Sequence, residues 1–271
     1  MTALPLAPLM TTSMPLPQFL TSAACERHQY YAVVPDTLRK DAVPLVVVHG
    51  ISRNAAELAL RFGERAHLEG VPVIAPLFER GTFGMYQQVV DQAGALPCDA
   101  ALAGILADAA GRFGFDASQV DLFGFSGGAQ FAHRYALLHP PRVRHCVAAA
   151  AGWYTMPDFA TAWPLGLAGA PHPIDRPALA RVRFDVVVGA LDRQQDKALR
   201  RSPEIDDVQG SHRLQRARRW HRAMRKAGFQ GSLQVIPDLS HAFGDAVHLG
   251  IVPLAFQLLA THRARHEVPE T

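Results

Sequence analysis

The sequence predicts a single α/β domain in which helices cover both faces of a mostly parallel sheet. Short apolar runs alternate with longer segments of helical periodicity over most of the 271 residues. Such alternation is typical of parallel strands joined by crossover helices. Hydrophobic residues make up 49% of the chain and charged residues 19%, so we expect a core of the size that one such domain needs.

The predicted strands are short runs rich in β-branched and other apolar residues, which suit strands buried on both faces. In chain order they cover residues 43–49 (VPLVVVH), 71–76, 121–125, 145–151, 184–189 and 232–236. Residues 29–34 (QYYAVV) precede them and could add antiparallel strands at one edge of the sheet.

The predicted helices are the longer segments whose apolar residues recur with helical spacing. They cover residues 53–70, 97–113, 127–138, 211–228 and 252–262. Gly70 suits the left-handed position that closes a helix, and Pro140 and Pro141 stop the third helix.

One segment, residues 156–182, breaks the alternation because it holds five prolines and has no clean period. We expect it to be a small cap-like excursion above the carboxyl edge of the sheet, where folds of this class bind ligands. The predicted domain spans residues 29–265, with an N-terminal arm at 1–28 and a polar tail at 266–271.

The first 24 residues contain no Lys or Arg, and four prolines interrupt their apolar runs. A secretory signal needs a basic start followed by an uninterrupted apolar stretch, so this arm is not expected to be one. No later apolar run has the length of a membrane span. We therefore expect a loosely ordered arm, no membrane association and a cytoplasmic protein.

Composition and motifs argue against several classes of partner and cofactor. The net charge of +3 is too small to indicate nucleic acid as a partner. The three cysteines are far apart and show neither a disulfide framework nor CxxC spacing. No phosphate loop, dinucleotide fingerprint or HExxH motif is present, so we expect neither a cofactor nor a metal.

Residues 120–130 (VDLFGFSGGAQ) place Ser126 among three glycines, between a predicted strand and a predicted helix. Gly124, Ser126 and Gly128 match the G-x-S-x-G pattern of a nucleophilic serine on a sharp strand-to-helix turn. Such a turn strains the backbone and leaves no room for side chains at the two outer glycines. The backbone N–H of Gly127, at the start of the helix, would face a developing oxyanion.

A nucleophilic serine needs a histidine base and a carboxylate that orients this base. In this strand–turn–helix context they are expected in the chain order Ser, Asp or Glu, His. Asp192 follows the predicted strand 184–189, and His241 lies in the loop after strand 232–236. We therefore predict Ser126, Asp192 and His241 as the catalytic residues. Other carboxylates and histidines also follow Ser126, but we expect them to be solvent-exposed, to cap a loop or to lie on the face of a helix. They are Asp196, Asp206, Asp207, Asp238, His212, His221 and His248.

The loop after strand 43–49 is expected to supply a second oxyanion donor. Ile51 follows His49 and Gly50 there, so its backbone N–H is the predicted donor beside that of Gly127. We expect His49 to brace this loop by hydrogen bonding rather than to act as the base.

With these residues in place, the chain resembles the α/β-hydrolase fold superfamily over about residues 29–262. The stretches VVVHGISRNAAE and GFSGGAQFAHRYALLHP are similar to the polyhydroxybutyrate depolymerase-like and feruloyl-esterase-like branch. The resemblance implies a serine esterase, without a cofactor, that cleaves short acyl or hydroxyacyl esters. The chain lacks the signal and disulfides of extracellular members, which favours a small-molecule ester or an oligomer over an insoluble polymer.

Trp153, Tyr154 and Met156 follow strand 145–151 at the carboxyl edge, so they are candidates to line the substrate pocket beneath the excursion, which should cover Ser126. Ordinary packing is an equal interpretation of these three. Residues 193–226 are rich in arginine, which predicts a solvated helix face. A second interpretation is that Arg193 and its neighbours attract a carboxylate-bearing substrate.

Two other functions stay open at this point. The Ser-Gly-Gly run also occurs in peptidases and amidases of similar fold. A catalytically silent protein that uses the fold for binding is the third interpretation, although such proteins usually lose a member of the triad. The sequence does not indicate the oligomeric state.

Overall fold

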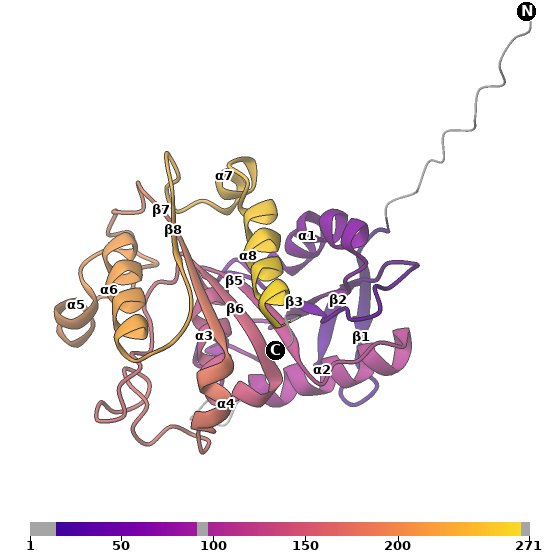
Figure 1. The fold of residues 1–271 in the computed structure, drawn as a ribbon, viewed down its shortest axis with the longest axis horizontal. Helices are drawn as coiled ribbons and strands as arrows, with labels where there is room; N and C mark the ends of the chain where they lie inside the picture. The colour runs from indigo at the N-terminus through magenta and orange to yellow at the C-terminus, as the bar shows by residue number, and fades with distance from the viewer. Residues whose placement is uncertain (1–14, 91–96, 267–271) are drawn as a thin grey trace, which may run out of the picture.

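The computed structural model describes residues 15–90 and 97–266. In this part of the chain a single eight-stranded sheet has the order β1-β2-β4-β3-β5-β6-β7-β8 (Figure 1). The neighbouring strands from β4 through β3 to β8 are parallel, whereas β2 pairs antiparallel with β1 and with β4. The prediction of a mostly parallel sheet with an antiparallel edge is confirmed.

The strands are short and, except at the edges, buried. They are β1 Gln18–Thr21, β2 Gln29–Val33, β3 Leu45–Val48, β4 Val73–Leu77, β5 Val120–Phe125, β6 Val143–Ala149, β7 Arg183–Gly189 and β8 Leu233–Ile236. The predicted boundary between an arm and the domain at residue 28 is wrong, because β1 lies inside that arm. Phe19 and Leu20 pair with Tyr31 and Tyr30 of β2, so this short apolar run completes the sheet edge.

Helices lie on both faces of the sheet. They are α1 Ala55–Glu69, α2 Cys98–Phe113, α3 Gly127–Leu138, α4 Arg176–Arg181, α5 Pro203–Gln209, α6 Arg213–Lys226, α7 Phe243–His248 and α8 Ile251–His266, with short 3-10 helices η1 Tyr86–Gln88 and η2 Pro140–Arg142. One buried core joins the sheet to α1 and α8, and the other joins it to α2, α3 and α6. Gly70 ends α1 in the left-handed conformation, as predicted. None of the described helices combines the length and the apolar character needed to cross a membrane.

The C-terminal boundary also differs from the prediction. Helix α8 was expected to end at residue 262 but continues to His266, the first residue of the predicted polar tail. The rest of that tail lies outside the described residues.

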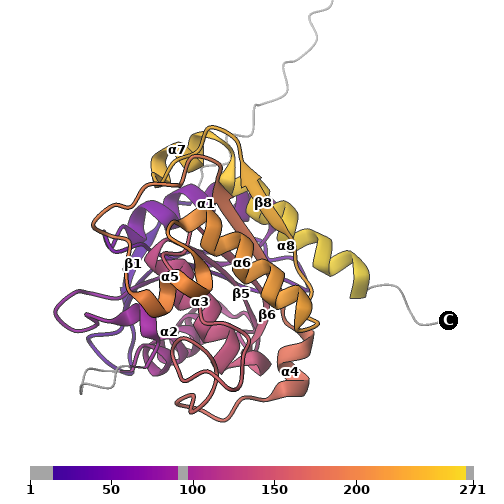
Figure 2. The same cartoon turned by 90° about the vertical axis from the view of Figure 1, so that its left-hand side faces the viewer.

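The excursion 156–182 does not lie above Ser126, which corrects the predicted cap. The chain after β6 is fastened to the side of the domain, because the Thr155 N–H donates to His133 of α3 and the Trp220 indole of α6 donates to the Thr155 carbonyl. From there the segment runs to the end of the molecule opposite α7 (Figures 1 and 2). At that end His172 contacts Asp99 at the start of α2.

The arginine-rich segment is only partly the solvated face that the sequence predicts. Arg213 and Arg216 of α6 are 1% and 0% exposed. Arg216 is bound to the backbone carbonyls of Gly152 and Gly210 and to Asp206, so it joins α5, α6 and the chain after β6. A buried guanidinium with several carbonyl and carboxylate partners is a structural tie between segments rather than a surface charge.

Candidate active site

The turn between β5 and α3 holds Ser126 in a strained conformation, with φ 56° and ψ −113°. A Cβ atom on Gly124 would collide with the carbonyl oxygen of Gly128, and one on Gly128 would collide with that of Val48. The two glycines are therefore required by the close approach of the backbone, as the motif predicts. The Ser126 N–H donates to the carbonyl of Ala149 at 2.8 Å, which attaches the turn to the neighbouring strand β6.

Ser126, His241 and Asp192 form one continuous chain of hydrogen bonds. The Ser126 hydroxyl lies 2.9 Å from Nε2 of His241, and Nδ1 of His241 lies 2.8 Å from Oδ2 of Asp192. The carboxylate of Asp192 is fully buried, while the His241 side chain is 19% exposed. With Nδ1–H donating to the carboxylate, Nε2 is free to accept the serine proton.

Two loops at the carboxyl edge bring Asp192 and His241 together across 49 residues of sequence. The Ala190 N–H donates to the Ile236 carbonyl and the Leu191 N–H to the Leu239 carbonyl, both at 2.9 Å. Gly189 permits this contact, since a Cβ there would collide with the Leu239 carbonyl. The loops after β7 and β8 thus run side by side, and each presents one side chain to Ser126.

The loop after β3 lies against the start of α3. The Ile51 nitrogen would be 3.4 Å from a Cβ on Gly127, so the two predicted oxyanion donors are close together. His49 braces the loop as expected: its Nδ1 bonds the Gly50 carbonyl at 2.8 Å, and its Nε2 accepts the Phe78 N–H at 3.0 Å. Burial lowers the pKa of His49 to about 4, so the ring is neutral at physiological pH and can play both roles.

No family model matches the chain, and no curated protein matches its sequence. Solved structures do match it. The poly(aspartic acid) hydrolase-1 of Sphingomonas sp. KT-1 is 26% identical, with a TM-score of 0.76 over 89% of this chain and 99% of that chain. This chain has the α/β-hydrolase fold.

A second structure confirms the resemblance to the depolymerase-like branch. The poly(3-hydroxybutyrate) depolymerase of Bordetella parapertussis is 29% identical, with a TM-score of 0.71 over 84% of this chain and 83% of that chain. The S-formylglutathione hydrolase of Agrobacterium tumefaciens is 16% identical, with a TM-score of 0.59 over 92% of this chain and 94% of that chain. At that identity the likeness concerns the fold alone.

Three further residues lie against the candidate site, and the sequence analysis predicted none of the contacts that they make there. Arg213 is buried beside Asp192, with Nη1 3.5 Å from Oδ1, and it also binds Asp196 at 2.6 and 3.1 Å. These hydrogen bonds hold the pKa of Asp196 below its usual value. Phe125 stacks on the imidazole of His241 with ring centroids 5.4 Å apart. Tyr86 donates its hydroxyl to the His49 carbonyl at 2.8 Å and so fastens the loop after β3.

The sequence signals for Arg213 and Tyr86 are weak. Arg213 is one of many arginines in its helix, and only its contacts with Asp192 and Asp196 distinguish it. Tyr86 belongs to the aromatic and glycine-rich stretch GTFGMY that follows β4. Such a composition in a loop after a strand indicates that the loop could contribute to the site.

The structure places the three predicted pocket residues elsewhere. Tyr154 is 0% exposed and stacks on Trp220 of α6, so it has no surface that a substrate could contact. The Trp153 ring lies beneath the guanidinium of Arg134 at 3.9 Å. Met156 lines a surface pocket over α5 and α6. The packing interpretation describes Trp153 and Tyr154, because the chain after β6 descends between α3 and α6 instead of rising over Ser126.

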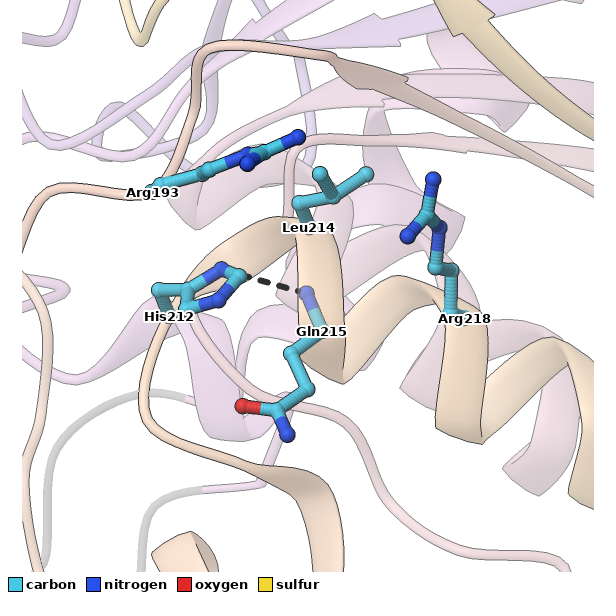
Figure 3. Close-up of a pocket in the computed structure, with 5 residues that line it drawn as sticks. All are labelled: Arg193, His212, Leu214, Gln215 and Arg218. Atoms are coloured by element: carbon cyan, nitrogen blue, oxygen red, sulfur yellow. Dashed lines mark hydrogen bonds between the residues drawn. The ribbon is translucent and has the colours of Figure 1, made fainter.

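A basic pocket of about 240 Å³ lies next to Asp192, at the start of α6. Figure 3 shows its lining residues, with the Arg193 and Arg218 guanidiniums on two sides of Leu214. His212 caps α6 by accepting the Gln215 N–H, and its pKa is lowered by burial and by the nearby Arg193 charge. Within the described part of the chain, neither arginine forms an ion pair with a carboxylate. The pocket therefore offers two unneutralised positive charges.

Proposed function

We propose that this chain is a serine hydrolase that cleaves a carboxylic ester through an acyl-enzyme. The observation that supports the proposal best is the chain of hydrogen bonds from Ser126 through His241 to Asp192, beside the N–H groups of Ile51 and Gly127. A strained serine, an oriented imidazole and two neighbouring backbone N–H groups are the parts that acyl transfer requires.

The proposed reaction has two halves. His241 Nε2 takes the proton of Ser126 as Oγ attacks the ester carbonyl carbon. The oxyanion accepts hydrogen bonds from Ile51 and Gly127, each worth a factor of about 10²–10³ in rate. The C–O bond to the alcohol then breaks, and the alcohol leaves with the proton from His241. Water, deprotonated by His241, attacks the acyl carbon, and Ser126 regains its proton as the acid departs.

A short acyl or hydroxyacyl ester is the proposed substrate, which rests on the likeness to a poly(3-hydroxybutyrate) depolymerase. The likeness to a poly(aspartic acid) hydrolase supports an alternative, hydrolysis of an amide by the same residues. The two reactions differ in the leaving group: an amide nitrogen must be fully protonated by His241 before the C–N bond breaks, whereas an alcohol needs less assistance and a p-nitrophenoxide needs none.

A comparison of matched substrates tests this choice. We expect the purified protein to cleave p-nitrophenyl acetate and butyrate with a higher kcat/KM than the corresponding p-nitroanilides, and to prefer them over the p-nitrophenyl ester of a long acyl chain. Comparable turnover of the anilides or of an aspartate oligomer would support the amidase instead. A folded sample that turns over none of these compounds would support the binding-protein interpretation.

We further propose that the basic pocket beside Asp192 binds a carboxylate of the substrate. Arg193 and Arg218 contribute two positive charges, and Arg193 follows the catalytic acid directly in the chain. A guanidinium matches a carboxylate in charge and in planar hydrogen-bonding geometry. A hydroxyacyl oligomer with a free acid end carries both groups that this proposal needs: a carboxylate for the pocket and an ester carbonyl for Ser126.

Replacing Arg193 or Arg218 with Gln is expected to raise KM about 10-fold for an ester that carries a free carboxylate, since a hydrogen bond to a charged group contributes about 1.5 kcal/mol or more. The KM for a neutral ester of the same length should not change. Arg225→Gln, which removes an exposed charge at the far end of α6, is the matched control. An equal effect of Arg225→Gln, or of Arg193→Gln on both esters, would contradict a specific carboxylate site.

A further inference from the structure

Three side chains that could bind a metal converge at the end of the domain away from α7. Asp99 lies in the first turn of α2, His139 follows α3, and His172 belongs to the excursion 156–182. The Nε2 atoms of His139 and His172 lie 3.0 and 2.8 Å from the same carboxylate oxygen, Oδ2 of Asp99. One ligand atom from each of the three lies within 4.8 Å of the other two.

The surroundings of this cluster suit a bound cation. Among the described residues, the ion-pair partners of Asp99 are these two imidazoles, and neither Lys nor Arg neutralises it. Burial acts to raise the pKa of Asp99, but the hydrogen bonds from His139 and His172 outweigh it and hold the pKa below the usual value. The Asp99 side chain is 8% exposed, whereas His172 is 41% exposed, so the cluster is closed on one side and open to solvent on the other.

We propose that Asp99, His139 and His172 form a binding site for a divalent transition metal ion of the Zn²⁺ type, with water as a fourth ligand. Two imidazole nitrogens and one carboxylate oxygen are ligands that Zn²⁺ accepts at about 2.0–2.2 Å. In a tetrahedral site, ligand atoms at these bond lengths are about 3.3 Å apart, so the observed 2.8 and 3.0 Å require shifts of a few tenths of an ångström. The exposed His172 can supply most of that movement.

The proposed role of the metal is structural. The three ligands come from α2, from the end of α3 and from the excursion, and a shared ion would fasten the excursion to both helices. This also explains why the sequence offers no metal motif. The ligands are separated by 40 residues and 73 residues from Asp99, so no short spacing brings them together.

The competing explanation is a cluster held by hydrogen bonds alone. In that case both imidazoles donate an Nε2–H to Asp99, whereas metal binding needs the Nε2 lone pair of each. His172→Gln separates the two explanations, because a glutamine side-chain amide can still donate to Asp99 but is a poor transition-metal ligand.

Titration of the chelator-treated full chain with Co²⁺ and Zn²⁺ tests the proposal. We expect one Co²⁺ per chain, with the visible absorption bands of four-coordinate cobalt, and displacement of Co²⁺ by Zn²⁺ but not by Ca²⁺, which prefers oxygen ligands. Zn²⁺ at about 100 times its Kd should raise the thermal midpoint by about 5–10 °C.

Three variants decide the outcome. His172→Gln should keep the metal-free thermal midpoint of the wild type and lose both the cobalt bands and the response to Zn²⁺, and His139→Gln should lose the same metal signals. His67→Ala, which removes a histidine at the end of α1, should bind as the wild type does. Absence of one-to-one binding by the wild type, or binding that survives in His172→Gln, would overturn the site. Hydrolysis of a neutral ester serves as a check that each sample is folded, since the cluster and Ser126 lie at different ends of α3.

Discussion

Replacing Ser126 with Ala is expected to lower kcat for a p-nitrophenyl ester on the order of 10⁶-fold and to abolish covalent labelling by a fluorophosphonate probe. The Ser126 hydroxyl lies 2.9 Å from Nε2 of His241, and no other described hydroxyl bonds to that nitrogen. Alanine keeps the Cβ and the backbone of the turn, so the thermal midpoint should change little. Labelling detected on a gel and steady-state kinetics measure the two effects.

Ser52→Ala is the control for that experiment. Ser52 lies in the loop after β3, and its hydroxyl contacts Asn54 rather than His241. This variant should be labelled as the wild type is. Labelling that persists in Ser126→Ala and disappears in Ser52→Ala would place the nucleophile elsewhere and refute the proposed mechanism.

Replacing Asp192 with Asn is expected to lower kcat about 10⁴-fold. The carboxylate accepts the Nδ1–H of His241, which leaves Nε2 as the base. An amide at this position would donate a hydrogen to Nδ1 and favour the opposite tautomer, whose Nε2–H cannot accept the serine proton. The side chain is nearly isosteric, and Arg213 still lies beside it, so the loss should fall on catalysis and not on folding. Steady-state kinetics and thermal unfolding distinguish the two.

Asp238→Asn is the matched control, because Asp238 lies three residues before His241 and was the nearest competing carboxylate in the sequence. Asp238 is exposed and adopts a positive φ of 59°, which asparagine also tolerates. Its replacement should change kcat little. A loss in Asp238→Asn as large as in Asp192→Asn would show that the acid was assigned to the wrong loop.

Tertiary contacts explain why some predictions failed. Nothing in the periodicity of residues 156–182 tells whether the segment rises over the sheet or descends beside it. That direction depends on Thr155, which is bound to His133 on α3 and to Trp220 on α6. The same descent removes Tyr154 and Met156 from the vicinity of Ser126. Strand β1 was not predicted for a similar reason. Its four residues are too few to show a hydrophobic periodicity, and only the pairing with β2 identifies them as a strand.

The sequence by itself determined the alternation of strands and helices, the glycines that the turn at Ser126 requires, and the order of Ser126, Asp192 and His241. These are local properties, because hydrophobic period and backbone freedom are encoded within a few residues, and parallel strands necessarily share one carboxyl edge. Only the tertiary structure decided that Arg213 lies beside Asp192, that the excursion packs at the far end, and that Asp99, His139 and His172 meet. Such contacts join residues that are distant in the chain, and they depend on how whole segments pack against one another.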